Sequence, residues 1–314
     1  MTAPLLDVSD LSVEFPQRRR RLQALDRISF TLEAGEVLGF VGESGAGKSL
    51  TGAAIMGLLE PPGRITLQGQ RIDGRAETVR GRRIGMIFQD PLTSLNPLRT
   101  VGDQLVETIQ LHLGMDSGAA AVRAGELLDE VGIDRSRIGA YPHEFSGGMR
   151  QRIVIALALA PEPELIIADE PTTALDVSIQ AQVLALLRRL CKERGAAVIL
   201  ITHDMGVIAE TTDRVAVLYA GRLVETGHTA EVISAPRHPY TRGLMAATPN
   251  LDHVSVDTVL PQIPGSMPSL ADLPPGCRFH PRCGDVMPVC RRTAASFAEG
   301  VACHLYDTQS PEAG

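Results

Sequence analysis

The segment Gly42–Ser49, which reads GESGAGKS, constrains this chain more than any other stretch of its sequence. It fits the consensus G-x-x-x-x-G-K-[ST] without a mismatch, and it lies between an apolar run, EVLGFVG, and a helix-forming segment, KSLTGAAIMGLL. Gly42, Gly45 and Gly47 permit backbone turns that other residues avoid, so that backbone N–H groups face phosphate oxygens. The segment therefore predicts a buried strand, a phosphate-binding loop and a helix in an α/β fold.

Two residues of this loop carry side chains suited to a nucleoside triphosphate with Mg²⁺. Lys48 is placed to reach the β- and γ-phosphates, and the Ser49 hydroxyl to bind the metal. Lysine is scarce here, because only Lys48 and Lys192 occur among 30 basic residues, which favours a specific role for Lys48. The predicted nucleotide contacts in the loop are Gly42, Glu43, Ser44, Gly45, Ala46, Gly47, Lys48, Ser49 and Leu50.

A second apolar run, ELIIADE, ends in two acidic residues, Asp169 and Glu170. Ligands bind at the carboxyl ends of the strands of an open α/β sheet, and this run is typical of such a strand. We expect Asp169 to hold Mg²⁺ together with Ser49, and Glu170 to polarise the attacking water. The alternative for Asp169 is the cap of a helix.

The segment FSGGMRQR predicts a second anion-binding helix start, at Ser146, Gly147 and Gly148. A helix start without a ligand is the alternative. The order of the motifs resembles the ATPase subunits of ABC transporters, although Phe145 and Met149 replace the usual Leu and Gln of their signature. In that family the signature of one subunit covers the γ-phosphate held by its partner's loop. The resemblance thus implies a head-to-tail dimer that buries two ATP molecules.

Other positions match the same family one by one. Phe15 corresponds to the aromatic residue that stacks on adenine, with an apolar strand end as the alternative. Gln89 resembles the glutamine that senses Mg²⁺ and the attacking water, so it is an expected Mg²⁺ contact together with Ser49 and Asp169. His203 resembles the histidine that contacts the γ-phosphate. The segment Ala174–Asp176, ALD, resembles the loop that crosses the dimer interface, so Asp176 is a further expected nucleotide contact. Glu170, His203 and Gln89 are the predicted catalytic residues.

The expected organisation follows this resemblance and the periodicity of the chain. Residues 1–235 form an ABC-type nucleotide-binding domain that begins with an antiparallel β subdomain, because LLDVSDLSVEF and ALDRISFTLE alternate apolar and polar residues. A helical subdomain is inserted at about residues 90–160. Residues 236–314 are rich in proline and predict a small, irregular C-terminal extension.

The segments SAPRHPYTRGLMAATP, LPPGCRFHPRC and QDPLTSLNPLRTVGDQL resemble the ATPase subunits of oligopeptide/dipeptide (peptide/nickel) importers. That family implies a second, homologous ATPase subunit, two permease subunits whose coupling helix docks beside Gln89, and an extracytoplasmic binding protein. It places the chain on the cytoplasmic face of the inner membrane. Peptides are the expected cargo, with nickel, glutathione or another small solute as alternatives.

A nucleic-acid ATPase of the same superfamily is the rival interpretation. The net charge of −7 gives no general basic surface, and the chain carries a single set of ATPase motifs with ordinary spacing. No apolar run approaches a membrane span, and the N-terminus lacks a signal-peptide pattern. These observations favour a cytoplasmic transport motor.

Four of the five cysteines lie close together, at Cys277, Cys283, Cys290 and Cys303. In a cytoplasmic chain such a cluster indicates a metal site more than disulfides. The loose spacing favours a [4Fe-4S] cluster, and the alternatives are Zn²⁺ or no metal, with the cysteines as reduced thiols or disulfides. His280 or His304 is a possible replacement ligand, although a structural role is expected for both. Cys191 is expected to be an ordinary buried residue.

Overall fold

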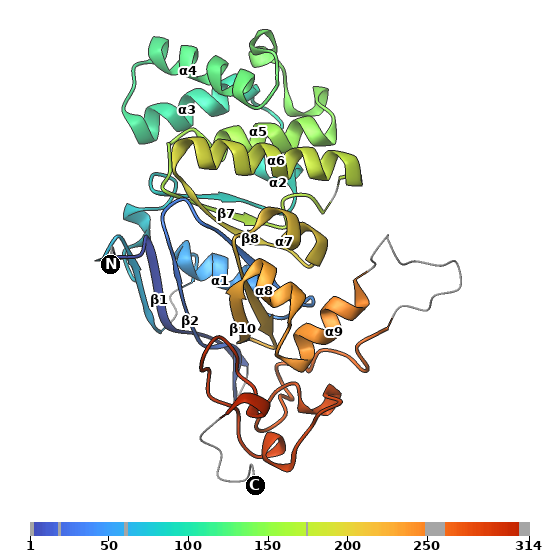
Figure 1. The fold of residues 1–314 in the computed structure, drawn as a ribbon. Helices are drawn as coiled ribbons and strands as arrows, with labels where there is room; N and C mark the ends of the chain where they lie inside the picture. The colour runs from blue at the N-terminus through green and yellow to red at the C-terminus, as the bar shows by residue number, and fades with distance from the viewer. Residues whose placement is uncertain (1–2, 18–19, 60–61, 174, 249–260, 308–314) are drawn as a thin grey trace, which may run out of the picture.

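The computed structural model describes residues 3–17, 20–59, 62–173, 175–248 and 261–307. Two sheets and a layer of helices make up the fold (Figure 1). The smaller sheet has the order β2-β1-β4-β5, and every pairing in it is antiparallel. Its strands are β1 (Leu6–Gln17), β2 (Arg20–Leu32), β4 (Arg64–Leu67) and β5 (Gln70–Arg71). The predicted antiparallel start of the chain is therefore confirmed.

The larger sheet has the order β10-β9-β3-β8-β7-β6. Its pairings are parallel except that of β10 with β9, which is antiparallel. Its middle strands are apolar and buried because helices or the other sheet cover both faces. The strands are β3 (Val37–Val41), β6 (Ile84–Ile87), β7 (Leu165–Asp169), β8 (Ala197–Ile201), β9 (Arg214–Tyr219) and β10 (Arg222–His228).

The helices lie in several parts of the fold. Helix α1 (Lys48–Ile55) packs against both sheets, in one core with Leu6, Ile167 and Ile201. The layer at the top of Figure 1 contains α3, α4, α5 and the crossover helix α6. The bounds of the remaining helices are α2 (Pro91–Ser94), α3 (Val101–Leu113), α4 (Ser117–Glu130), α5 (Gly147–Leu159), α6 (Val177–Arg194), α7 (Met205–Thr211), α8 (Thr229–Ser234) and α9 (Pro239–Ala247), with 3₁₀ turns at Ala76–Thr78, Arg135–Gly139, Pro142–Glu144, His280–Arg282, Pro288–Arg291 and His304–Tyr306.

Polar caps fix where the helices of the inserted layer begin. The side chains of Thr100, Asp116 and Ser146 each accept a backbone N–H from the first turn of α3, α4 and α5, respectively. A single apolar core joins these helices to α6 and the larger sheet. The predicted helical insertion is present, while the division of the chain at residue 235 stays a prediction.

One predicted helix is shorter in the structure than in the sequence pattern. Helix α1 ends at Ile55 rather than near residue 59, because the chain turns at Gly57, which has a φ of 63°.

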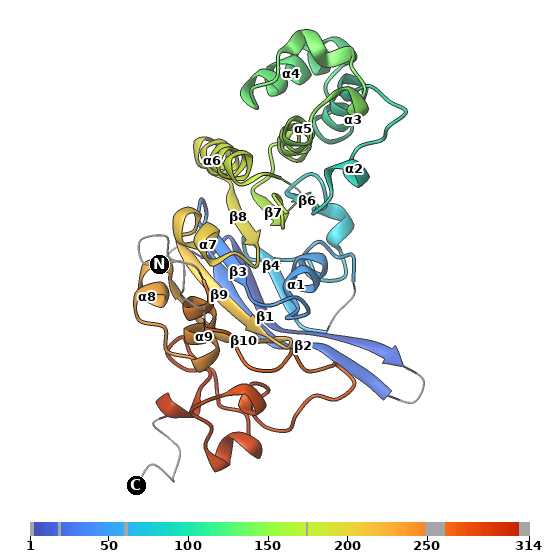
Figure 2. The same ribbon diagram turned by 90° about the vertical axis from the view of Figure 1, so that its right-hand side faces the viewer.

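The C-terminal extension lies at the end of the molecule opposite the helical layer (Figures 1 and 2). It has few regular elements, as predicted, and packs around Tyr219, Tyr240 and Phe279, whose rings meet edge-on or tilted. Part of it also follows the edge of the larger sheet. The N–H of Ala302 donates to the carbonyl of Val224 in β10, and the N–H of Thr226 donates to the carbonyl of Gly300.

Candidate active site

The loop Gly42–Ser49 connects the end of β3 to the start of α1, as predicted. It forms one wall of a cleft of about 760 Å³. The cleft thus collects the predicted catalytic side chains around the loop. Its lining residues are Gly42, Glu43, Ser44, Gly45, Ala46, Gly47, Lys48, Ser49, Leu50, Gln89, Glu170, His203, Leu244 and Leu270.

Glycine is required at two points of the loop. Gly42 has a φ of 153°, and a Cβ there would lie 2.3 Å from the carbonyl oxygen of Leu218. Gly47 has a φ of 105°, and its Cβ would lie 2.5 Å from Leu25. A side chain at Gly42 would collide with the backbone of β9, and one at Gly47 with Leu25 of β2, so either would displace the loop.

Lys48 is buried, and its ammonium group binds backbone carbonyls at the start of the same loop. Its Nζ donates to the carbonyl oxygens of Gly42, at 2.7 Å, and Glu43, at 3.2 Å. Burial lowers the pKa of Lys48 from its usual range, and the carboxylates of Glu170, Asp169 and Glu43 oppose that change. The result is a positive charge held in place before any ligand arrives.

Ser49 and Asp169 meet as the sequence predicted. The Ser49 hydroxyl donates to Oδ1 of Asp169 at 2.9 Å. Burial raises the pKa of Asp169, and the nearby Glu170 adds to this effect, whereas Ser49 and Lys48 oppose it. One hydroxyl and one carboxylate oxygen side by side are the hard ligands that Mg²⁺ prefers.

Glu170 joins the other two predicted catalytic residues. Its Oε2 accepts a hydrogen bond from Nε2 of Gln89 at 3.0 Å and another from the Thr173 hydroxyl at 2.9 Å. Its Oε1 lies 3.3 Å from Nδ1 of His203. The side chains that follow β6 and β8 therefore both contact the carboxylate that follows β7, at the edge of the cleft.

The cleft fits a nucleoside triphosphate with Mg²⁺. The first N–H groups of α1 have no acceptor inside the helix, and they adjoin the buried Lys48. Positive charge and N–H donors thus face the same space, while Ser49 and Asp169 offer metal ligands beside it. ATP and Mg²⁺ are the expected ligands of this arrangement.

Other predicted nucleotide contacts lie away from the cleft. Ser146 caps α5, and Gly147 and Gly148 begin it, so the signature segment belongs to the helical layer. Phe15 lies on β1 with 36% of its surface exposed, and Asp176 lies exposed before α6. None of these five lines the cleft of this chain, and their roles stay predictions. Ala174 lies outside the described residues.

The structure adds residues to the site that the sequence did not suggest. Leu244 and Leu270 of the C-terminal extension line the cleft, and Tyr240 and Arg282 hold Glu43 of the loop. The proline-rich composition of the extension predicted irregular structure and gave no signal of these contacts.

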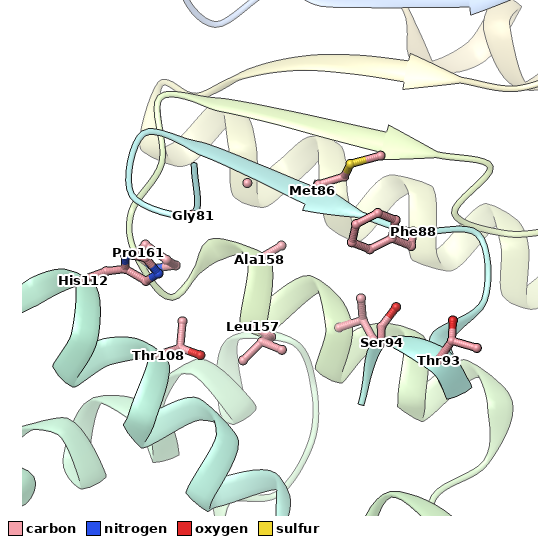
Figure 3. A pocket seen from close by; sticks show the side chains of 12 residues that line it. Gly81, Met86, Phe88, Thr93, Ser94, Thr108, His112, Leu157, Ala158 and Pro161 are labelled. Carbon is pink, nitrogen blue, oxygen red and sulfur yellow. The ribbon is translucent and has the colours of Figure 1, made fainter. Parts of the chain in front are cut away.

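A second hollow, of about 500 Å³, lies between β6 and the helices α2, α3 and α5 (Figure 3). Phe88, Thr93, Ser94, Thr108 and Leu157 face it. We call it the helical groove. Because Phe88 directly precedes Gln89, the groove adjoins the segment that reaches Glu170.

The four clustered cysteines line one small cavity of about 20 Å³, and all are free thiols. Burial raises the pKa of Cys303 to about 11, and the neighbouring cysteines contribute. Across the described residues, however, no three His, Cys, Asp or Glu side chains stand together as a metal site needs. The structure therefore does not support a ready-made iron–sulfur or zinc centre, because the thiols border the cavity without converging on one point.

Two smaller expectations about this region agree with the structure. His280 Nδ1 lies 2.9 Å from the carbonyl oxygen of Cys277, and His304 Nε2 lies 3.0 Å from that of Thr293, as structural residues would. Cys191 is buried in α6, and burial raises its pKa to about 12. No helix in the part of the chain that the structure describes is both long and apolar enough to cross a membrane.

Comparison with known proteins gives consistent relatives. Residues 25–173 match the family model described as ABC transporter, and residues 224–290 match the model for the C-terminal region of oligopeptide/dipeptide transporters. The oligopeptide transport ATP-binding protein OppD of Salmonella typhimurium is 49% identical over 91% of this chain and 88% of its own length. OppD of Bacillus subtilis is 48% identical over 91% of this chain and 83% of its own.

Solved structures share the fold. A dimeric ATP-binding cassette bound to ADP and Pi after hydrolysis has a TM-score of 0.65 and 27% identity, covering 71% of this chain and 98% of that one. CbiO1 from Clostridium perfringens, part of an ABC transporter complex, has a TM-score of 0.66 and 29% identity, covering 74% of this chain and 91% of that one.

Proposed function

The chain belongs to the ABC transporter family, among the ATP-binding proteins of oligopeptide importers, and we propose that it is an ATP-hydrolysing subunit that drives peptide import. The observation that carries this proposal is the junction of Gln89, Glu170 and His203 beside the phosphate-binding loop. The test is ATP hydrolysis and peptide uptake by the complex assembled with its permease subunits in vesicles. Hydrolysis that nucleic acid stimulates and the permease does not would favour the rival nucleic-acid ATPase.

The site works by position and charge. Lys48 and the N–H groups at the start of α1 hold the phosphates, and Ser49 with Asp169 would hold Mg²⁺. When bound, Mg²⁺ would neutralise part of the negative charge of the phosphates. Glu170 orients and polarises the attacking water, and Gln89 and His203 keep its carboxylate in place.

We propose that a second ATPase subunit is needed to cover the nucleotide bound at this site. Ser146, Gly147 and Gly148 offer a capped helix start for an anion, yet they lie away from the loop of their own chain. A head-to-tail partner would place its own signature over the nucleotide held here. The support is that a related cassette was solved as a dimer bound to ADP and Pi. We propose a homologous, non-identical partner, and Phe15 and Asp176 as further nucleotide or interface contacts.

The chain acts with transmembrane permease subunits, and we propose the helical groove as the place where a short cytoplasmic helix of the permease docks. The groove is lined largely by apolar and small side chains, and Phe88 connects it to Gln89. Movement of the docked helix would therefore shift Phe88 and Gln89, and with them the hydrogen bond from Gln89 to Glu170. We therefore propose that the chain lies on the cytoplasmic face of the inner membrane, and that the extracytoplasmic binding protein contacts the permease only.

A charge in the groove should uncouple the chain from the permease. We expect Leu157→Asp to lower permease co-purification at least about tenfold, because a carboxylate in an apolar contact must be desolvated without a partner. Leu111→Asp is the matched control, since Leu111 is 75% exposed on α3 outside the groove. Nucleotide binding by the isolated subunit should remain in both variants. Normal permease binding by a folded Leu157→Asp protein would exclude this docking site.

The cargo is proposed from the relatives, whose names specify oligopeptide transport. Nickel, glutathione and other small solutes remain alternative cargoes. Ligand binding by the binding protein that co-purifies with the complex distinguishes them, because this subunit's residues face nucleotide and permease rather than cargo.

For the cysteines we propose a metal clip, a [4Fe-4S] cluster in preference to Zn²⁺, that assembles by a small rearrangement around the shared cavity. Support comes from the four thiols lining one site within a segment of few regular elements. After anaerobic purification of the full chain, iron and zinc analysis should find about four iron atoms per chain. Cys290→Ser should lose them, whereas Cys191→Ser, which changes a buried cysteine outside the cluster, should keep them. One zinc ion per chain would show that the clip holds Zn²⁺ rather than an iron–sulfur cluster. The absence of both metals would contradict the proposed metal clip.

A further inference from the structure

The phosphate-binding loop is held by a side chain from the far end of the sequence. Arg282 binds the carboxylate of Glu43 through two parallel bonds, Nη1 to Oε2 at 2.8 Å and Nη2 to Oε1 at 2.9 Å. Only 7% of the Arg282 side chain and 27% of the Glu43 side chain are exposed. A bidentate, largely buried pair of this kind fixes both partners in orientation as well as in distance.

Arg282 is itself fixed before it meets the loop. Its Nε donates to the carbonyl of Pro264 at 2.7 Å, and its guanidinium carbon lies 5.8 Å from the centre of the Tyr219 ring. It ends the 3₁₀ turn His280–Arg282, directly before Cys283. The guanidinium of Arg282 is therefore held by Pro264 and Tyr219 in addition to Glu43.

A second contact from the extension pins the backbone of the same residue. The N–H of Glu43 donates to Oη of Tyr240 at 2.8 Å. Tyr240 is fully buried, and its ring packs edge-on against Tyr219 with centres 4.7 Å apart. Both the side chain and the N–H of Glu43 are thus occupied by the extension.

The ion pair between Arg282 and Glu43 affects the charge of the phosphate-binding loop. Glu43 adds a negative charge to this loop, which must receive phosphates. Glu43 and Lys48 belong to the same loop, and Nζ of Lys48 donates to the backbone carbonyl of Glu43 at 3.2 Å. The guanidinium of Arg282 offsets the negative charge of Glu43 and fixes its carboxylate through two hydrogen bonds. Without Arg282, this charge would compete for Lys48 and repel the incoming triphosphate.

We propose that Arg282 and Tyr240 are positioning residues of the nucleotide site, so that the C-terminal extension sets the affinity of the loop for ATP. The proposal rests on the proposed function, in that the loop must bind nucleotide. It assigns the extension a role in ATP binding that is separate from any metal held by its cysteines.

The test measures the dissociation constant of the full chain for N-methylanthraniloyl-ATP with Mg²⁺, together with the melting temperature. Arg282→Gln should raise the dissociation constant about tenfold, and Tyr240→Phe, which keeps the ring, about threefold. Arg282→Lys should fall between the wild type and Arg282→Gln, because it restores charge without the bidentate geometry. Arg242→Gln is the matched control, since Arg242 forms an exposed ion pair with Asp285 in the same extension.

A double-mutant cycle separates positioning from simple stability. In a Glu43→Gln background, Arg282→Gln should change the dissociation constant by less than about twofold, because its partner charge is already gone. In the assembled complex, turnover at saturating ATP should stay near normal while the KM rises. Unchanged affinity in folded Arg282→Gln, or an equal loss in both backgrounds, would overturn the proposal. Failure of the wild-type chain to bind nucleotide would instead refute the proposed function.

Discussion

Replacing Glu170 by Gln should lower ATP turnover at least about a hundredfold in the complex assembled with its partners, while ATP binding persists. The amide oxygen of Gln can still accept from Gln89 and Thr173, so the local structure remains. What is lost is the carboxylate charge that polarises water. The variant should therefore accumulate in an ATP-bound, closed form.

Phosphate release and nucleotide binding measured on the same preparation check this result. Glu210→Gln is the control, because Glu210 is exposed on α7 and lies outside the cleft. Near-normal turnover by Glu170→Gln would show that another group polarises the water. Loss of binding together with turnover would indicate that Glu170 serves the fold rather than the reaction.

Replacing Lys48 by Gln should weaken ATP binding at least about a hundredfold, and hydrolysis should fall with it. The substitution removes a buried positive charge and also the bonds from Nζ to the carbonyl groups of Gly42 and Glu43. The chain provides a matched control in Lys192→Gln, which alters the second lysine, exposed on α6.

Equilibrium binding of labelled ATP, with the melting temperature measured without nucleotide, distinguishes a lost ligand contact from a lost fold. Tight binding by a folded Lys48→Gln protein would contradict the assignment of the triphosphate to this loop. An equal effect from Lys192→Gln would point to general charge rather than to the site.

The centre of the site was predictable because its residues follow patterns that are local in the sequence. The loop joins a strand to a helix within eight residues, and Asp169 and Glu170 end one apolar run. Parallel strands then bring their carboxyl ends to one edge, which places Gln89 and His203 beside Glu170.

The supports of the site were not predictable in the same way. Tyr240 lies 197 residues after Glu43, and Arg282 lies 239 residues after it. Their contacts depend on how an irregular segment packs, which neither periodicity nor a short motif encodes. The antiparallel pair β9 and β10 was also missed, since a turn between two short buried strands leaves a weak pattern.

The cysteine cluster was predictable in its position but not in its geometry. Sequence proximity correctly placed four thiols around one cavity, but it did not determine whether they converge on a common centre. Convergence depends on side-chain directions within loops, and tertiary packing sets these directions.

The strand β10 forms one border of the larger sheet, and such borders carry backbone groups open to pairing with another molecule. Here the segment at Gly300–Ala302 already occupies some of those groups through Val224 and Thr226. The extension therefore shields part of this border from pairing with another molecule. A shortened chain that ends near residue 235 would keep every residue of the catalytic junction and would lose this protection, along with the cover over Tyr219.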